Sequence, residues 1–120
     1  MPGFLDSDTL QIEAERFKLL GHLVRLQILD ILRRNPECVC HLQAMLNKPQ
    51  PYISQQLRVL REAGIIADTK DGLNVYYHLV DDKTASYLDT AFEPVLKAVG
   101  GEREPIAGCP CPKCHAPEYA

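Results

Sequence analysis

The first third of the chain carries apolar residues at helical spacing. Residues 9–20 (TLQIEAERFKLL) predict a helix whose apolar side is formed by Leu10, Ala14, Phe17 and Leu20. Residues 23–34 (LVRLQILDILRR) are apolar at more positions than one stripe requires, which predicts a helix that is buried on most sides. Gly21-His22 separates the two helices, and Asn35-Pro36 ends the second.

Two shorter helices with a tight turn between them follow. Residues 41–46 (HLQAML) and 51–63 (PYISQQLRVLREA) have helical patterns, with the turn at Asn47-Lys48-Pro49 and Gly64 after the second. The second helix is expected to bury Ile53, Leu57 and Leu60, which follow one another at i, i+4 and i+7. Its other face is polar, and this combination is typical of a helix-turn-helix.

The pattern changes from helical to strand-like after Gly64. The runs IIADT and NVYYHLV flank Asp71-Gly72, which predicts a β-hairpin. Residues 83–99 return to helical spacing, and Pro94 either kinks that helix or begins a second segment. We therefore predict a mainly α fold with a small β-hairpin, a winged helix-turn-helix, over residues 1–100. Residues 101–120 are expected to form a flexible tail rich in cysteine and proline.

Length and composition favour one small domain outside the membrane. The 120 residues, 46% hydrophobic, can bury only a modest core, which dimerisation would enlarge. No apolar run approaches the roughly 18 residues of a membrane span, and the acidic start MPGFLDSDTLQIE lacks the features of a signal peptide. We expect a cytoplasmic protein with no membrane partner. A net charge of −3 disfavours a nonspecific coat on nucleic acid but is compatible with a local basic patch.

Three stretches resemble the ArsR/SmtB family of bacterial metal-sensing repressors. They are ECVCHL at 37–42, ISQQLRVLREAGII at 53–66 and DGLNVYYHLVD at 71–81. With the flanking helices, the resemblance covers roughly residues 8–99, and the CxC motif is similar to that of the arsenite- and cadmium-sensing branch. The resemblance implies a homodimer that binds operator double-stranded DNA when metal-free and releases it when the inducer binds. No catalytic acid–base set is recognisable, so we do not expect an enzyme.

Cys38 and Cys40 are the first candidate metal ligands. Residues i and i+2 within a helix point to different faces, but Pro36 and Glu37 are expected to keep Cys38 in extended backbone, with Cys40 at or near the N-cap. Both sulfurs can then converge on one soft ion. Thiolates favour As(III) or Sb(III) as the inducer, and Cd(II), Pb(II), Zn(II) and Cu(I) remain open. The alternative is that both cysteines are small buried apolar residues.

A third ligand is missing at the positions where relatives have one. Arsenite-sensing members carry a third cysteine three residues after the second cysteine of the motif, where this chain has Gln43. Residues 1–30 of this chain contain no cysteine either. The tail motif CPCPKCH supplies further candidate ligands, with a metal-binding CxxC spacing, at Cys109, Cys111 and Cys114. These thiols complete the Cys38/Cys40 site, hold a separate ion, or are incidental. The alternative hypothesis to a metal(loid) sensor is a redox or persulfide sensor, in which Cys38 or Cys40 pairs with a tail cysteine.

Two further positions depart from the family pattern. His41 stands where relatives have an aspartate, and we expect it to be solvated or to cap the helix, with a ligand role as the alternative. The family's other metal site, on the last helix, is expected to be absent. Asp81 matches its first ligand, but the remaining ligands are replaced by Lys83, Pro94 and Lys97.

The polar face of residues 50–61 and the hairpin are the predicted DNA contacts. By the resemblance, the base-reading residues are Gln50, Tyr52, Ser54 and Gln55. Phosphate contacts are expected from Lys48, Arg58, Arg61 and the hairpin residue Lys70. The alternative for each is a solvated surface side chain. The twofold interface is expected to contain Leu10, Phe17, Leu88, Phe92 and Val95.

Overall fold

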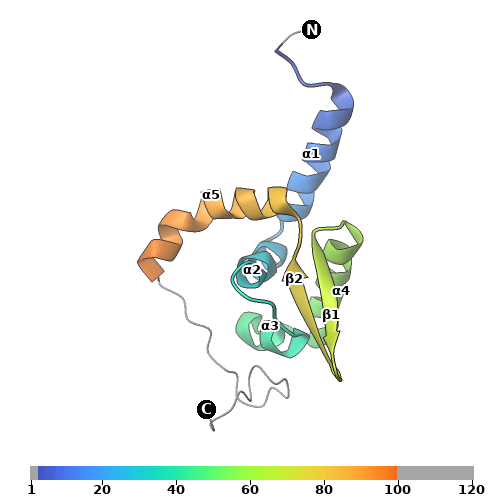
Figure 1. Cartoon of the computed structure of the whole chain (residues 1–120), viewed down its shortest axis with the longest axis vertical. Helices are drawn as coiled ribbons and strands as arrows, with labels where there is room; N and C mark the ends of the chain where they lie inside the picture. The colour runs from blue at the N-terminus through green and yellow to red at the C-terminus, as the bar shows by residue number, and fades with distance from the viewer. Residues whose placement is uncertain (1–2, 100–120) are drawn as a thin grey trace.

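The computed structural model describes residues 3–99, with side chains as far as residue 93, and has the predicted order of elements (Figure 1). The helices are α1 (Ser7–Leu20), α2 (Leu23–Leu32), α3 (Val39–Leu46), α4 (Gln50–Glu62) and α5 (Asp82–Val99). Between α4 and α5 lie the strands β1 (Ile66–Asp71) and β2 (Asn74–Leu79). This is the predicted winged helix-turn-helix, in which α3 and α4 form the helix-turn-helix and the β-hairpin forms the wing.

Helix α1 stands out from the remaining elements, and α5 crosses beside its base (Figure 1). Asp6 caps α1, because its side chain accepts a hydrogen bond of 2.7 Å from the Thr9 amide. Helix α2 ends at Leu32, two residues before the predicted end. The expectation that α2 is buried on most sides is wrong for its first turn. Leu23 is 71% exposed, since no described residue covers it at the edge of the domain.

The helix-turn-helix surrounds the centre of the core. Ile53, Leu57 and Leu60 of α4 are at most 1% exposed, which confirms the predicted buried stripe. They pack with α2 residues and with Leu42 of α3 in one hydrophobic cluster. The turn between α3 and α4 begins at Asn47, whose φ of 52° is a left-handed conformation that asparagine tolerates. The core thus holds α4 rigidly with its polar face outward.

The wing is a two-stranded antiparallel sheet. Its register pairs Ile66 with Leu79 at the base and Asp71 with Asn74 at the tip. Gly72 supplies the positive φ of 65° at the first position of the two-residue turn Gly72-Leu73, so the predicted hairpin is confirmed, with Asp71 as the last residue of β1. The strands reach two residues nearer the tip than the β-rich run IIADT indicated, because Lys70 and Asp71 also pair with β2.

Helix α5 continues through Pro94 as one helix and bends toward its end (Figure 1). Proline lacks the amide that would bond to the carbonyl four residues earlier, so a bend rather than a break is the outcome of the two alternatives. Leu88 is only 3% exposed and belongs to the domain core, which corrects its assignment to a twofold interface. In the part of the chain that the structure describes, no helix has the length and apolar character of a membrane span.

Candidate functional site

The two cysteines of the CxC motif lie at the start of α3. Cys38 is the N-cap residue, in extended backbone (φ −86°, ψ 165°), and its side chain makes no capping hydrogen bond. The helix begins at Val39, so Cys40 lies in the first turn, two residues after the N-cap and near it as expected. Cys38 is 7% exposed, Cys40 is half-buried, and neither forms a disulfide in the described part of the chain. The N-terminus of α3 therefore holds two soft donors beside first-turn amides that have no partner within the helix.

A buried acid–histidine pair encloses the two cysteines in the sequence. Glu37 and His41 are each 2% exposed, and His41 Nε2 lies 3.3 Å from Glu37 Oε2. The expectation that His41 is solvated or caps the helix is therefore wrong. No sequence pattern distinguishes Glu37 from any other residue before the motif. Glu37 is buried because its backbone pairs with Tyr77 of β2. The two residues are forty positions apart, so no local sequence pattern indicates this contact.

The described residues hold two thiol ligands but no complete metal centre. Among residues 3–99, no three His, Cys, Asp or Glu side chains are grouped as a metal site. Cys38 and Cys40 fit a soft thiophilic ion by their chemistry, and a third ligand is needed from elsewhere. The predicted tail ligands Cys109, Cys111 and Cys114 lie outside the described residues.

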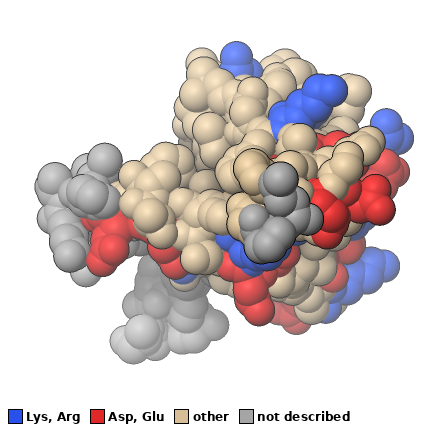
Figure 2. All heavy atoms as spheres, turned by 90° about the horizontal axis from the view of Figure 1, so that it is seen from above, with Lys and Arg blue, Asp and Glu red and all other residues tan. Residues whose placement is uncertain are grey.

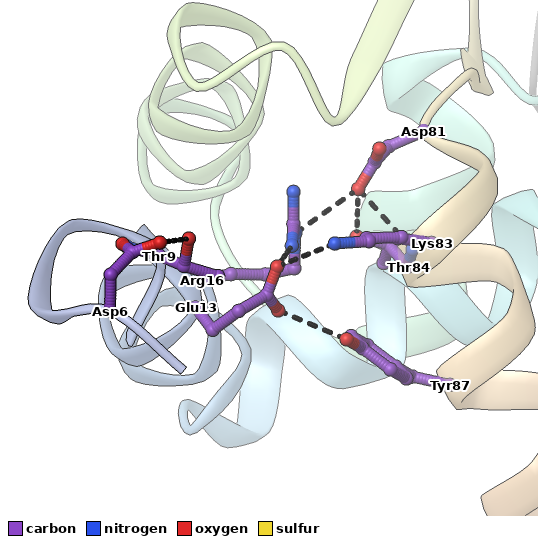
Figure 3. Close-up of polar contacts among 8 residues, drawn as sticks. All are labelled: Asp6, Thr9, Glu13, Arg16, Asp81, Lys83, Thr84 and Tyr87. Atoms are coloured by element: carbon purple, nitrogen blue, oxygen red, sulfur yellow. Dashed lines mark hydrogen bonds and ion pairs between the residues drawn. The ribbon is translucent and has the colours of Figure 1, made fainter. Parts of the chain in front are cut away.

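A polar cluster joins α1 to the start of α5 (Figure 3), at the place where the resemblance implies the family's second metal site. Asp81 accepts hydrogen bonds from the amide and hydroxyl of Thr84, and Arg16 Nε lies 3.4 Å from its Oδ2. Lys83 Nζ donates to Glu13 at 2.8 Å. The carboxylate that matches the first metal ligand is thus engaged by an arginine and a helix cap. An ammonium stands at the next position, which supports the expected absence of this site.

Glu13 is the acceptor at the centre of the cluster. Hydrogen bonds from Lys83, Arg16 and the Tyr87 hydroxyl lower the pKa of Glu13 to about 2. A carboxyl whose pKa is lower in the folded state stabilises the fold above its unfolded pKa. That stabilisation is lost as the pH falls through the folded pKa.

We therefore expect Glu13→Gln to be less stable than the parent above about pH 5, with a difference that shrinks between the ordinary pKa of 4.5 and about 2. Urea unfolding of both proteins from pH 7 to pH 2.5 measures this difference. The matched control is Glu15→Gln, at an exposed position of the same helix. A difference for Glu13→Gln that is constant across the pH range would contradict the assignment.

The polar face of α4 has the exposure that DNA contact requires. Seven of the eight predicted DNA-binding residues are exposed: Lys48, Gln50, Ser54, Gln55, Arg58, Arg61 and Lys70. Tyr52 is half-buried and packs against the core, so only part of its ring is accessible. Arg61 Nη1 lies 3.7 Å from Asp68 Oδ2 of the wing, which offsets part of its positive charge. Of the other exposed residues, Gln50, Ser54, Gln55 and Arg58 belong to α4 itself.

Sequence reasoning missed one residue that orients α4. Gln56 is 6% exposed, and its Oε1 accepts a hydrogen bond of 2.8 Å from Arg25 Nε of α2. Because a buried amide needs a partner, this bond links the rotation of α4 to α2. Gln56 adjoins Gln55 in the motif SQQL, and only the helical position, on the side of Ile53 and Leu60, distinguishes the buried glutamine from the exposed one.

Comparison with known proteins agrees with this architecture. The family model described as "Bacterial regulatory protein, arsR family" matches residues 24–68, which span α2 to β1. The HTH-type transcriptional regulator NmtR of Mycobacterium tuberculosis is 36% identical over 106 residues, covering 87% of this chain and 88% of NmtR. The chain belongs to the arsR family. The match confirms the family given by the resemblance, while the arsenite- and cadmium-sensing branch stays a prediction. These relatives are transcriptional regulators rather than enzymes.

Other relatives of this ArsR-family regulator align over shorter regions. The uncharacterized HTH-type transcriptional regulator MJ1325 of Methanocaldococcus jannaschii is 45% identical over 76 residues, covering 62% of this chain and 85% of MJ1325. The arsenical resistance operon repressor of Escherichia coli K12 is 44% identical over 64 residues. That alignment covers 52% of this chain and 55% of the repressor, so the chain spans about half the length of that relative.

Solved structures of this family share the fold. The antimony-specific transcriptional repressor AntR superposes with a TM-score of 0.69 at 26% identity, covering 79% of this chain and 86% of AntR. This agreement confirms the winged helix-turn-helix as the architecture of the ArsR-family chain.

Proposed function

We propose that this ArsR-family regulator is a transcriptional repressor that leaves its operator when a soft metalloid binds Cys38 and Cys40. The observation that carries the proposal is the thiol pair at the N-terminus of α3, with Cys38 as the N-cap and Cys40 in the first turn. Arsenite is the favoured inducer, with Sb(III) next. In support, one relative is named an arsenical resistance operon repressor and one structural neighbour an antimony-specific repressor.

The proposed mechanism begins with a change at the first turn of α3. Side chains two residues apart at a helix start must be drawn together to share one ion, so ion binding reshapes the backbone around residues 38–40. Helix α3 packs on α4 through Leu42, which is fully buried. A shift of α3 therefore alters the position of α4. The ion acts only as far as it binds the DNA-free form better than the DNA-bound form.

The tail is proposed to supply the third ligand. If Cys109, Cys111 or Cys114 completes the site, truncation after Ala107 raises the arsenite concentration needed for half release by about tenfold or more, because a three-thiolate site loses one bond. Operator release followed by fluorescence anisotropy measures this. A matched control replaces the three tail cysteines by serine at full length. An unchanged response of both variants would show that the tail thiols are incidental.

We expect the repressor to be a homodimer. Figure 2 looks onto the end of the molecule that carries α1 and shows broad areas without charged side chains. Three apolar side chains of α1 are at least 52% exposed in the single chain: Leu10, Ile12 and Phe17. Such a surface is typical of an interface. A second copy covers it, and two α4 helices then face successive major grooves.

The mass in metal-free buffer at micromolar concentration tests the homodimer. We expect twice the chain mass of 13.5 kDa, and a shift toward the monomer for Phe17→Asp. Leu73→Asp is the matched control, because Leu73 is fully exposed at the tip of the wing, away from α1. A parent protein with the mass of one chain contradicts the expectation.

A scan of ions against operator release tests the proposed function. The protein is bound to labelled operator DNA and titrated with As(III), Sb(III), Cd(II), Pb(II), Zn(II) and Cu(I) under reducing conditions. Release by As(III) or Sb(III) at lower concentration than by Zn(II) is expected. The redox or persulfide alternative predicts the opposite dependence, namely release by an oxidant together with loss of free thiols and no release by arsenite.

A further inference from the structure

The segment that carries Cys38 is hydrogen-bonded to the wing. The Glu37 amide donates to the Tyr77 carbonyl at 3.0 Å, and the Tyr77 amide donates to the Glu37 carbonyl at 2.8 Å. This isolated antiparallel bridge places residue 37 against β2 on the edge away from β1. In Figure 1, the chain between α2 and α3 accordingly passes beside β2. Glu37, the residue before the first thiol, is thus hydrogen-bonded to the free edge of the wing by a single bridge.

The bridge does not compete with the pairing of the wing itself. Tyr77 lies opposite Asp68 in the β1–β2 register. Antiparallel pairs alternate between hydrogen-bonded and non-bonded, and both backbone groups of Tyr77 are directed to Glu37. The Asp68–Tyr77 pair is therefore a non-bonded one. The hydrogen bonds between β1 and β2 therefore hold the hairpin together even when residue 37 is displaced.

Glu37 is also held by its side chain. Its carboxylate lies 3.3 Å from His41 Nε2 in the second turn of α3, and both side chains are buried. Cys38 and Cys40 lie in the sequence between these two residues. The backbone of Glu37 is thus fixed to β2 and its side chain to α3. A buried carboxylate that loses its partner is costly, so the two attachments act together.

We propose that Glu37 is a positioning residue that transmits occupation of the Cys38/Cys40 site to the wing. The inference rests on the proposed thiolate site. It adds a structural link from that site to the wing, beside the link through α3 to α4. When an ion draws the two sulfurs together, residue 37 moves with its neighbour Cys38, and the bridge to Tyr77 opens or shifts. The wing, with Lys70 near its tip, then leaves the position that suits DNA.

Amide hydrogen exchange of the full-length protein without DNA tests this route. Saturating arsenite is expected to speed exchange of the Tyr77 amide by about tenfold or more, because the bridge that protects it opens. The amide of Leu29, in the buried middle of α2, serves as the reference and stays unchanged. Unchanged exchange at Tyr77, in protein that arsenite does release from its operator, overturns the inference alone. Absence of release overturns the proposed function, and the inference with it.

Side-chain variants separate positioning from ion binding. The readouts are arsenite affinity of the DNA-free protein and the ratio of operator Kd values with and without saturating arsenite. Glu37→Ala is expected to change arsenite affinity by less than about threefold and to lower the Kd ratio by about tenfold. Glu37→Gln, which can still hydrogen-bond to His41, is expected to retain the ratio within about threefold.

The control for these variants is Glu15→Ala, at an exposed position of α1. A Glu37→Ala protein with the parent's ratio overturns the inference. So does one that loses arsenite affinity alone, because Glu37 would then act at the ion and not on the wing. If Glu37→Ala does not fold, the exchange measurement on the parent still decides the question.

Discussion

Serine in place of either Cys38 or Cys40 is expected to abolish operator release by arsenite and to leave operator binding intact. The oxygen of serine is a poor ligand for a soft ion, while its size keeps the packing at the start of α3. Neither cysteine belongs to the exposed face of α4, so the metal-free operator Kd should stay within about threefold, or about 0.6 kcal/mol. Anisotropy titrations of labelled operator, first with protein and then with arsenite, measure both quantities.

Two controls make this result specific to the site. Gln43→Ala, at the position where arsenite-sensing relatives have a cysteine, is expected to respond as the parent does. Circular dichroism of the serine variants should match the parent and exclude loss of fold. Parent-like release by both single variants would indicate that the ion is bound elsewhere, for example by the tail.

The second large effect is expected at the DNA-reading face. Gln55→Ala should reduce discrimination between operator variants by about 1–3 kcal/mol, if its exposed amide pairs with a base. Arg58→Ala should instead weaken binding to all sequences and lower the salt slope by about 1, because a phosphate contact releases one counterion. Operator and random DNA are compared for each variant over a series of salt concentrations.

Matched substitutions on α2 and just after its end control for changes of charge and size. Gln27→Ala removes an exposed glutamine and Arg34→Ala an exposed arginine, both outside the helix-turn-helix. Neither should alter discrimination by more than about 0.5 kcal/mol. Equal effects of Gln55→Ala and Arg58→Ala on operator and random DNA would show that the two roles are wrongly assigned.

The sequence predicted the elements well because each carries a local signal. The stripe of Ile53, Leu57 and Leu60, Gly64 after α4 and the Asp71-Gly72 turn depend on spacing and backbone preference, and the structure agrees with all of them. The errors arose where burial depends on distant elements. Helical spacing predicts Leu88 at the interface, but it lies in the core, and it predicts Leu23 in the core, but it is exposed.

The candidate site was only partly predictable for the same reason. The CxC motif identifies Cys38 and Cys40 without knowledge of the fold. Glu37 and His41 became visible as a buried pair only once residue 37 was found beside β2, a contact between residues forty apart. The orientation of Gln56 toward Arg25 likewise depends on how α4 packs on α2. Periodicity predicts which face of an element is buried, but not which polar groups meet there.

The most direct test of the central claim is arsenite titration of the operator-bound Cys38→Ser, Cys40→Ser double variant beside the parent. The double variant removes both described thiols, so no remaining member of the pair can hold the ion with help from a tail cysteine. We predict that the parent leaves the operator as arsenite is added. The double variant is predicted to bind the operator with parent-like affinity and to stay bound at every arsenite concentration. Release of the double variant at the same arsenite concentration as the parent would contradict the claim.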